Sequence, residues 1–521
     1  MTGADALLRT AAAAGLDVCF ANPGTTELDL VKALEGSGVR PILGLFEGVC
    51  TGAADAYARM AGRPALVLLH LGPGLANGLA NLHNAAKART PVVALVGDHA
   101  TAHIGKGAPL EADVEAFARP VSRWVRTCLT PGAMAGDLAE ALEAATAPPG
   151  GVATLVVPAD CAWGEAELDG IDVRARVAEL ARGRAASQLR ARVDDAAIEQ
   201  AAAALPGGVL LVGGDALGAE AGVRAAGRIA AATGCRLMAE TFPARMERGG
   251  DLPVLPRLEY FPESATDSLR GATSLVPAGT PEPIAFFAYP ELASEITPPD
   301  VPVQVLSAPG QDGVDALERL AERLGARDGL PPGPAPAAPE PGPLTPASLG
   351  AALAASQPEG AIVVDEGITV AGPYWAASAG APRHTLLGLT GGAIGMGPPA
   401  ATGAAVACPD RPVLALQADG SAMYTLQALW TQAREGLDVT TVIVANRGYR
   451  ILAVEMERAG MQEPGPVIAP LTDLGSPALD WVALATGMGV PAVRATTTEG
   501  LTEALGRAFA EPGPHLVEAV L

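Results

Sequence analysis

Residues 413–449 constrain the fold more than any other stretch of the chain. They read as an apolar run that leads to Asp419, a helical pattern from Ser421 to Gly436, and a β-branched run that leads to Asn446. A strand, a helix and a strand in this order predict a right-handed βαβ unit, whose two strands are parallel. Because the carboxyl ends of parallel strands meet at one edge of a sheet, we expect Asp419 and Asn446 to lie close together there.

The residue types at that edge suit a metal-bound phosphate group. The side-chain oxygens of Asp419 and Asn446 are hard ligands of the kind that Mg²⁺ or Ca²⁺ prefers. The amides of Gly420 and Ser421 open the predicted helix, where an anion is favoured. Taken singly, Asp-Gly and Asn-x-Gly are also ordinary turn sequences, so a purely structural role for these residues stays open.

The spacing resembles the metal and diphosphate signature of thiamine diphosphate (ThDP)-dependent enzymes, a Gly-Asp-Gly turn followed by Asn-Asn. Here Ala418 replaces the first Gly, and Ala445 replaces the first Asn. In the family the second Asn holds the metal, and a main-chain oxygen at the position of Gly448 is the third protein ligand. The resemblance therefore implies ThDP and Mg²⁺ as cofactors, with Asp419, Asn446 and Gly448 as the metal ligands.

Further cofactor contacts follow from the same resemblance. Gly392 would offer its carbonyl to the aminopyrimidine, and Ile394 would support the bent shape of the cofactor. Without the family, Ile394 reads as a core residue and Thr369 as a turn residue. The remaining expected contacts, with the diphosphate or next to it, are Ile368, Thr369, Gly420, Ser421, Tyr424, Asn446 and Tyr449.

The order of strand and helix patterns predicts an α/β protein with three doubly wound parallel-sheet domains. Residues 1–165 form the expected first domain, 190–330 the central one and 346–521 the third, with a Pro-rich linker at 331–345. The ThDP family has the same order of a pyrimidine-binding, a central and a diphosphate-binding domain.

In the central domain we expect strands at residues 208–212, 236–239, 284–288 and 303–306. The turn at 213–218 contains glycines but lacks the full Gly-x-Gly-x-x-Gly pattern. A structural turn is therefore favoured over a dinucleotide site.

Composition bears on the possible partners. A formal net charge of −22 argues against nucleic acid or an anionic membrane as the main partner. No signal peptide or membrane-spanning apolar run is apparent. The six cysteines are dispersed without metal-ligand spacing, which is typical of reduced thiols. We therefore expect a cytoplasmic enzyme that acts on a small molecule.

Three candidate catalytic residues lie in the first domain. Glu47 follows an apolar run and precedes a Gly- and Ala-rich helix, so burial is expected. Alone it reads as a helix cap or an ion-pair partner, but the segment resembles the activating glutamate of the family, which contacts the pyrimidine ring. His70, beside a Gly-Pro-Gly turn, suits acid–base work, although a lone His is more often structural. Thr25 is the candidate substrate-side hydroxyl, with a simple turn role as the alternative.

Two branches of the family share these segments. NPGTTE and His70 resemble benzoylformate decarboxylases, whereas GPGLANGLANL resembles acetolactate synthases. The sequence thus predicts a ThDP- and Mg²⁺-dependent decarboxylase or carboligase of 2-oxo acids. The alternatives are an acetolactate synthase that condenses pyruvate, a flavin-dependent oxidase of the superfamily, and an inactive ThDP-binding regulatory homologue.

The resemblance also implies an assembly. Family members join the pyrimidine and diphosphate regions across a subunit interface, so a homodimer is the minimum and a homotetramer is common. Arg450 and Glu455 follow the metal site and are either solvated helix residues or contacts of a polar substrate.

Overall fold

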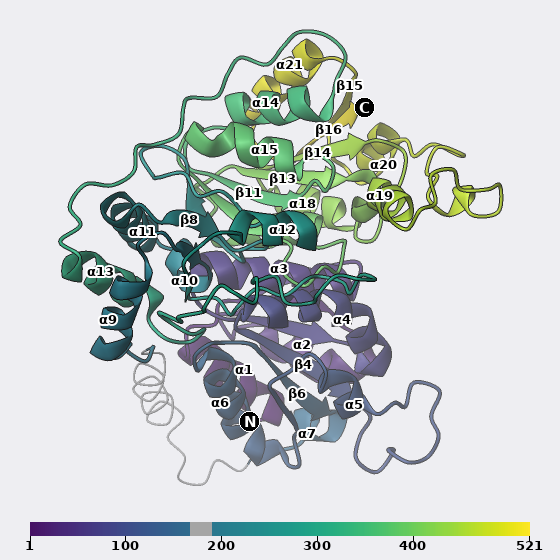
Figure 1. Ribbon diagram of the computed structural model, residues 1–521. Helices are drawn as coiled ribbons and strands as arrows, with labels where there is room; N and C mark the ends of the chain where they lie inside the picture. Colours follow the sequence, from purple (N-terminus) through teal and green to yellow (C-terminus); the bar gives the residue numbers. More distant parts are fainter. Residues whose placement is uncertain (167–189) are drawn as a thin grey trace.

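The computed structural model describes residues 1–166 and 190–521 and contains three β-sheets with helices packed against them (Figure 1). The first sheet lies in the lower part of the view and the third in the upper part, with the central one at the left. The expected α/β class is confirmed. We call the segments that build these sheets the first, central and third units.

The first unit has six parallel strands in the order β2-β1-β3-β4-β6-β5. The strands are β1 (Val18–Asn22), β2 (Arg40–Leu43), β3 (Ala65–Leu69), β4 (Val92–Asp98), β5 (Trp124–Thr127) and β6 (Val152–Pro158). The helices are α1 (Gly3–Ala13), α2 (Leu28–Leu34), α3 (Glu47–Ala61), α4 (Leu71–Ala88), α5 (Val114–Ala118), α6 (Met134–Thr146) and α7 (Ala159–Trp163).

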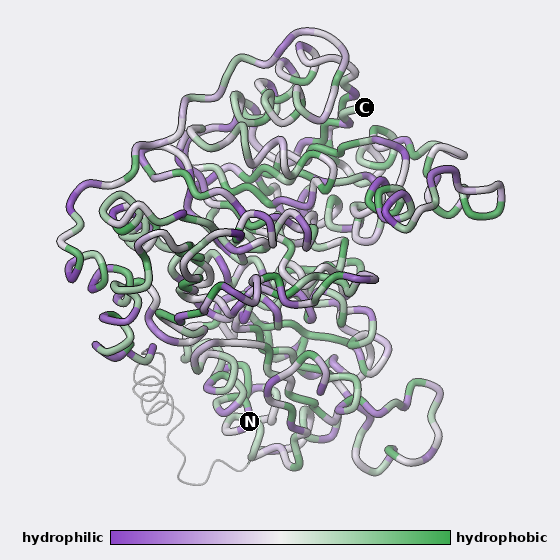
Figure 2. The backbone as a smooth tube through the Cα atoms, viewed as in Figure 1, coloured by the Kyte–Doolittle hydropathy of each residue, from purple (hydrophilic) through white to green (hydrophobic). Residues whose placement is uncertain are grey.

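Both faces of the inner strands β1, β3, β4 and β6 are buried, which explains why these strands are nearly continuous apolar runs. Along β3, Leu66 and Leu68 belong to one apolar cluster, whereas Val67 and Leu69 belong to another on the opposite face. This alternation follows the period of two residues in a strand. Figure 2 shows the hydrophobic positions running along the strands inside the unit.

Helix α3 lies between the first sheet and α16 (Gly397–Ala407) of the third unit. It is buried along almost its whole length because its side chains are mainly small. A Cβ atom at Gly52 would approach Pro399 Cβ to 2.7 Å. The Gly- and Ala-rich sequence of α3 is therefore what lets the first and third units pack closely beside Glu47.

The central unit has a three-stranded parallel sheet in the order β10-β7-β8. Its strands are β7 (Val209–Val212), β8 (Arg236–Ala239) and β10 (Leu275–Ala278), and its helices are α9 (Asp195–Ala204), α10 (Gly214–Leu217), α11 (Glu220–Thr233), α12 (Pro262–Leu269) and α13 (Gly313–Arg323).

Two of the four strands expected here are wrong. Residues 284–288 form no strand, because their aromatic side chains pack as a cluster in which Phe286 contacts Phe242 and Tyr260. Their place in the sheet is taken by β10, which we did not predict. Residues 303–306 lie beside β10 but pair with it only through isolated bridges.

The third unit has seven strands in the order β15-β16-β14-β13-β11-β12-β9. They are β9 (Met246–Arg248), β11 (Ala361–Glu366), β12 (His384–Gly388), β13 (Val413–Ala418), β14 (Val439–Ala445), β15 (Ala492–Ala495) and β16 (His515–Val520). Besides α16, the helices are α14 (Pro346–Ser356), α15 (Ala371–Ala377), α17 (Asp419–Ala422), α18 (Ala428–Glu435), α19 (Arg450–Arg458), α20 (Trp481–Gly487) and α21 (Thr498–Ala510).

The βαβ unit expected at residues 413–449 is present, since β13 and β14 are parallel neighbours. The single helix expected from Ser421 to Gly436 is wrong, because the structure divides it into α17 and α18. Between them the Thr425 hydroxyl donates to the Gly395 carbonyl at 2.8 Å, which ties the break to a neighbouring loop.

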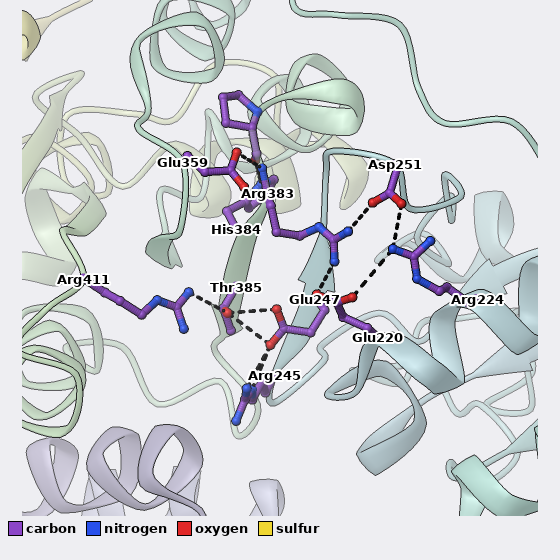
Figure 3. Close-up of polar contacts among 11 residues, drawn as sticks. Glu220, Arg224, Arg245, Glu247, Asp251, Glu359, Arg383, His384, Thr385 and Arg411 are labelled. Atoms are coloured by element: carbon purple, nitrogen blue, oxygen red, sulfur yellow. Dashed lines mark hydrogen bonds and ion pairs between the residues drawn. The ribbon is translucent and has the colours of Figure 1, made fainter.

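Strand β9 lies in sequence between β8 and β10 of the central unit, but it pairs antiparallel with β12 of the third. Figure 3 shows the polar contacts around this junction. Glu247 on β9 accepts hydrogen bonds from Thr385 on β12 and from Arg245. The central unit is thus fixed to the third by a shared sheet.

Among the described residues, no helix combines the length and the apolar character needed to cross a membrane. All six cysteines carry free thiols.

Candidate active site

The carboxyl edge of the third sheet brings the expected metal ligands together. Asp419 directly follows β13, and its Oδ2 accepts a hydrogen bond from the backbone N–H of Arg447 at 2.7 Å. Asn446 directly follows β14, and its Oδ1 accepts from the N–H of Gly448 at 3.0 Å. The four residues therefore lie around one point, as the parallel strands predict.

The donor set at this edge fits Mg²⁺. Asp419 is only 2% exposed, and burial raises the pKa of its carboxyl group, while the amides of Arg447 and Gly420 act to lower it. A buried carboxylate without a cationic partner gains from a bound cation.

The expected diphosphate contacts surround the same edge. The amide nitrogen of Asn446 donates to Thr369 Oγ1 at 3.1 Å, which places the turn after β11 beside the metal ligands. Gly420 and Ser421 begin α17, and the ring of Tyr449 lies where a side chain at Gly420 would be. Burial raises the pKa of the Tyr449 hydroxyl.

Glu366, a residue missed by the sequence analysis, holds the glycine-rich loop of residues 391–397. Its two carboxylate oxygens accept hydrogen bonds from Gly395 N at 2.6 Å and Gly397 N at 2.7 Å. Glu366 is fully buried, and burial raises its pKa to about 7. Ile394 lies in this loop, so the Glu366 carboxylate fixes the segment expected to support the cofactor.

The outer side of that loop carries aromatic rings. The ring of Phe286 fills the space beside Gly392, and Tyr424 packs against Gly395. Tyr424 is 53% exposed, so its ring faces open space at the cofactor edge. Ile394 packs on an apolar cluster that includes Met396.

Glu47 is the first residue of α3 and is buried, as expected. Asn77 of α4 donates to its Oε2 at 2.9 Å. Nearby, Asn81 donates to the carbonyl oxygens of Gly48, at 2.8 Å, and Gly395, at 3.4 Å. Within one chain, therefore, the N-terminus of α3 lies against the glycine-rich loop of the third unit.

His70 lies between β3 and α4. It pairs with Glu27, which the sequence analysis also missed. His70 Nδ1 lies 2.7 Å from Glu27 Oε2, and the two side chains are 26% and 0% exposed. Beside a carboxylate, Nδ1 carries the proton and Nε2 is left as the acceptor. A side chain at Gly24 would collide with the imidazole ring, so the glycine of NPGTTE is required for this approach.

The two threonines of NPGTTE differ in position. Thr26 Oγ1 donates to Glu27 at 2.5 Å and lies 3.4 Å from His70 Nδ1. Thr25 is exposed and has no side-chain hydrogen bond among the described residues. Thr26 therefore supports the Glu27–His70 pair, whereas the hydroxyl of Thr25 is free to meet a ligand.

Glu455 and Arg450, both on α19, have different surroundings. Glu455 accepts a hydrogen bond from the Tyr289 hydroxyl at 2.9 Å and pairs with Arg458, so it is occupied by a contact with the central unit. Arg450 is exposed and has no side-chain partner among the described residues.

Backbone strain gathers at the candidate site. Three of the five described non-glycine residues with positive φ lie there: Leu71 after His70, Ile368, and Arg447 after Asn446. Such conformations cost about 1–3 kcal/mol each and persist where the surrounding structure imposes them, often at functional sites.

The sequence matches two parts of one protein family, the thiamine pyrophosphate enzymes. The N-terminal TPP binding domain matches residues 1–117, and the C-terminal TPP binding domain matches residues 370–519. The chain belongs to the thiamine pyrophosphate enzymes. It is therefore a ThDP-dependent enzyme, with Mg²⁺ as the usual partner of the cofactor in this family.

Relatives and solved structures agree with this result. A Mycobacterium tuberculosis protein provisionally named acetolactate synthase large subunit IlvX is 50% identical and aligns over 100% of this chain and 99% of its own. Benzoylformate decarboxylase of Pseudomonas aeruginosa is 30% identical over 97% and 96% of the two chains. The fold also matches a Rhodococcus jostii ThDP-dependent 4-hydroxybenzoylformate decarboxylase (TM-score 0.84, 24% identity, 99% and 98% covered).

The expected family and cofactors are thus confirmed, and so is the expected class of enzyme. The relatives come from both branches that the sequence resembles. None of the comparisons supports the alternative of an inactive homologue.

Proposed function

We propose that the enzyme decarboxylates a 2-oxo acid in the manner of the benzoylformate decarboxylase branch and protonates the carbon that loses CO₂. When bound, ThDP supplies the carbon nucleophile and accepts the electron pair released with CO₂. The observation that carries the proposal is the His70–Glu27 pair. Release of an aldehyde requires a proton donor, and a buried carboxylate holds this one in place. Binding of the cofactor alone does not require such a donor.

Each candidate site residue has a definite role in this proposal. The proposed ligands of Mg²⁺ are Asp419, Asn446 and the Gly448 carbonyl. The diphosphate would be held by Gly420, Ser421 and Thr369, with Ile368, Tyr424 and Tyr449 beside it. Gly392 and Ile394 would orient the pyrimidine end of ThDP, and Glu47 would contact the pyrimidine ring. Thr25 meets the substrate carboxylate. His70, in the imidazolium form that the Glu27 carboxylate stabilises, delivers the proton from Nε2.

The first experiment is to measure CO₂ release from benzoylformate and from pyruvate with ThDP and Mg²⁺ present, and to identify the organic products. Benzaldehyde from benzoylformate is the expected result. If only polar 2-oxo acids react, the exposed Arg450 becomes the first residue to test. If no 2-oxo acid in a broad panel yields CO₂, the proposal is wrong.

The acetolactate synthase reaction is the second candidate. It is favoured by the 50% identity with the M. tuberculosis relative, whose name refers to this activity. Acetolactate formed from pyruvate would support it, and His70 would then have no proton to deliver to the product.

We also propose a homodimer as the minimum assembly, possessing active sites at the subunit interface, and a tetramer as the full one. Exposed apolar and aromatic side chains at the cofactor edge, such as Ile368 and Tyr424, support a second subunit there. Light scattering of the protein as it elutes from a size-exclusion column measures its mass and so tests the proposed assembly. A cytoplasmic location is proposed as well, supported by the free thiols.

A further inference from the structure

A cavity lies between the first and central units, apart from the candidate active site. Its volume is about 260 Å³, and its lining includes Gly214 and Gly279. Gly214 opens α10 just after β7, and Gly279 directly follows β10, so the cavity lies at the carboxyl edge of the central sheet. This edge of an open parallel sheet is the usual place for a ligand.

Four arginines line the cavity, and three of them have acidic partners. Arg245 is directed to Glu247, as Figure 3 shows. The three pairs are Arg59 with Asp55 (2.9 Å), Arg245 with Glu247 (2.9 Å) and Arg190 with Asp215 (3.6 Å). These arginines are already neutralised by carboxylates.

Arg89 is the exception. Its guanidinium is partly buried, yet no described residue accepts a hydrogen bond from it or forms an ion pair with it. Glu240 attracts Arg89 electrostatically but forms no hydrogen bond or ion pair with it. Its carboxylate accepts from Gly214 N and Thr280 Oγ1, and burial raises its pKa. Burial also lowers the pKa of Arg89, so the site would favour an added negative charge.

The next residue shows the same lack of a partner. Thr90 lines the cavity and is 3% exposed, and its hydroxyl has no hydrogen-bond partner among the described residues. Buried polar groups are normally satisfied, and exceptions call for an explanation such as a missing ion. Two adjacent residues thus offer donors without acceptors.

The size of the cavity limits the ligand. At about 260 Å³ it lies below the range of about 300–1,000 Å³ typical of sites for drug-sized molecules, so a dinucleotide does not fit. We propose that this cavity binds a small oxyanion, of the class of inorganic phosphate or a short dicarboxylate, with Arg89 as its main counter-charge and Thr90 as a second donor.

The cavity is separate from the active site but shares two elements with it. Glu47 is the first residue of α3, and Arg59 lies twelve residues later, which is about 18 Å along the helix. Arg59 also donates to the Gly388 carbonyl and to Thr390 Oγ1, at the start of the glycine-rich loop. The oxyanion is therefore expected to bind while ThDP occupies its own site.

The test uses the holoenzyme, with ThDP and Mg²⁺ bound so that the diphosphate site is filled. Calorimetric titration with inorganic phosphate, and separately with malonate, should show saturable binding of at least one of them, with a Kd of about 1 mM or lower. Binding of phosphate but not malonate would restrict the ligand class to tetrahedral oxyanions. Binding of malonate but not phosphate would restrict it to carboxylates.

Two variants make the test specific. Arg89→Gln should weaken binding about tenfold or more, whereas Arg119→Gln, the same change at an exposed surface pair of the first unit, should not. Thr90→Val should weaken binding about threefold or more, yet without oxyanion it should raise the melting temperature, because it removes an unpaired buried hydroxyl. The added oxyanion should raise the melting temperature of the wild type more than that of either variant. Absence of saturable binding to the wild type, or equal binding by Arg89→Gln and Arg119→Gln, would overturn the proposal.

Discussion

Glu27 and His70 are 43 positions apart in the chain, yet Glu27 Oε2 lies 2.7 Å from His70 Nδ1. The contact follows from the sheet order, because β1 and β3 are parallel neighbours with Asn22 aligned to Leu69. The residues that come after these two strands emerge side by side. The carboxylate engages Nδ1, and Nε2 has no hydrogen-bond partner among the described residues.

We expect Glu27→Gln to lower kcat about tenfold and His70→Ala to lower it about 100-fold or more, with little change in ThDP affinity. The glutamine keeps the size of the side chain but removes the charge that stabilises a protonated imidazole. Asp29→Asn is a matched control, since it neutralises a surface acid in the same segment. A fully active Glu27→Gln enzyme would show that the pair has no part in proton delivery.

Glu47→Gln is expected to bind ThDP and Mg²⁺ normally but to lose turnover about 100-fold or more, because an amide cannot exchange the proton that a carboxyl group shares with the pyrimidine. ThDP binding followed by tryptophan fluorescence separates the two effects. Asn77→Ala, which removes only the partner of the carboxylate, should have a smaller effect on kcat. Equal rates for Glu47→Gln and the wild type would remove Glu47 from its proposed role.

Asp419→Ala should weaken binding of ThDP with Mg²⁺ about 100-fold or more, because Asp419 is the only carboxylate among the three proposed metal ligands. Equilibrium dialysis of ThDP against a series of Mg²⁺ concentrations measures the loss. Asp410→Ala removes an acid from the exposed turn before β13 and should leave binding unchanged. Normal Mg²⁺ dependence in Asp419→Ala would place the metal elsewhere.

The sequence alone could predict the parts of the candidate site that lie on one βαβ unit. Asp419 and Asn446 could be brought together from the pattern alone, because the two strands follow each other in the chain and pair in parallel. The burial of Glu47 could be predicted as well, from the Gly- and Ala-rich helix that follows it.

The missed residues depend on contacts between strands that are not consecutive in the chain. The contact of Glu27 with His70 depends on β3 lying beside β1 in the sheet, although β2 lies between these strands in sequence. Glu366 is the last residue of β11, and its hydrogen-bond partners lie in the loop that follows β12. The wrong strand at residues 284–288 has a different cause, since a short aromatic run suits a buried strand and a loop cluster equally well.

Glu366 should make stability depend on pH. Burial raises its pKa from 4.5 to about 7, so the folded protein holds this proton more tightly than the unfolded chain does. Its contribution is complete below pH 4.5 and is lost as the pH rises through about 7, by about 3 kcal/mol at most. Glu366→Gln should flatten this part of the profile of unfolding midpoint against pH. Glu340→Gln, at an exposed position of the Pro-rich segment, should keep it. Identical profiles for the two variants would contradict the assignment.

The contact between α3 and α16 should be sensitive to a single methyl group. A Cβ atom at Gly403 would collide with the Ala53 carbonyl oxygen, so Gly403→Ala must push the two helices apart. We expect a loss of about 1–3 kcal/mol, seen as a lower midpoint of denaturant unfolding. Gly506→Ala is the matched control, because Gly506 lies in α21 with no atom near its missing Cβ. That change should stabilise by about 0.5–1 kcal/mol through helix propensity alone. Since Glu47 begins α3, Gly403→Ala should also reduce kcat, whereas Gly506→Ala should not. Stabilisation by both changes would mean that the two helices are not in close contact.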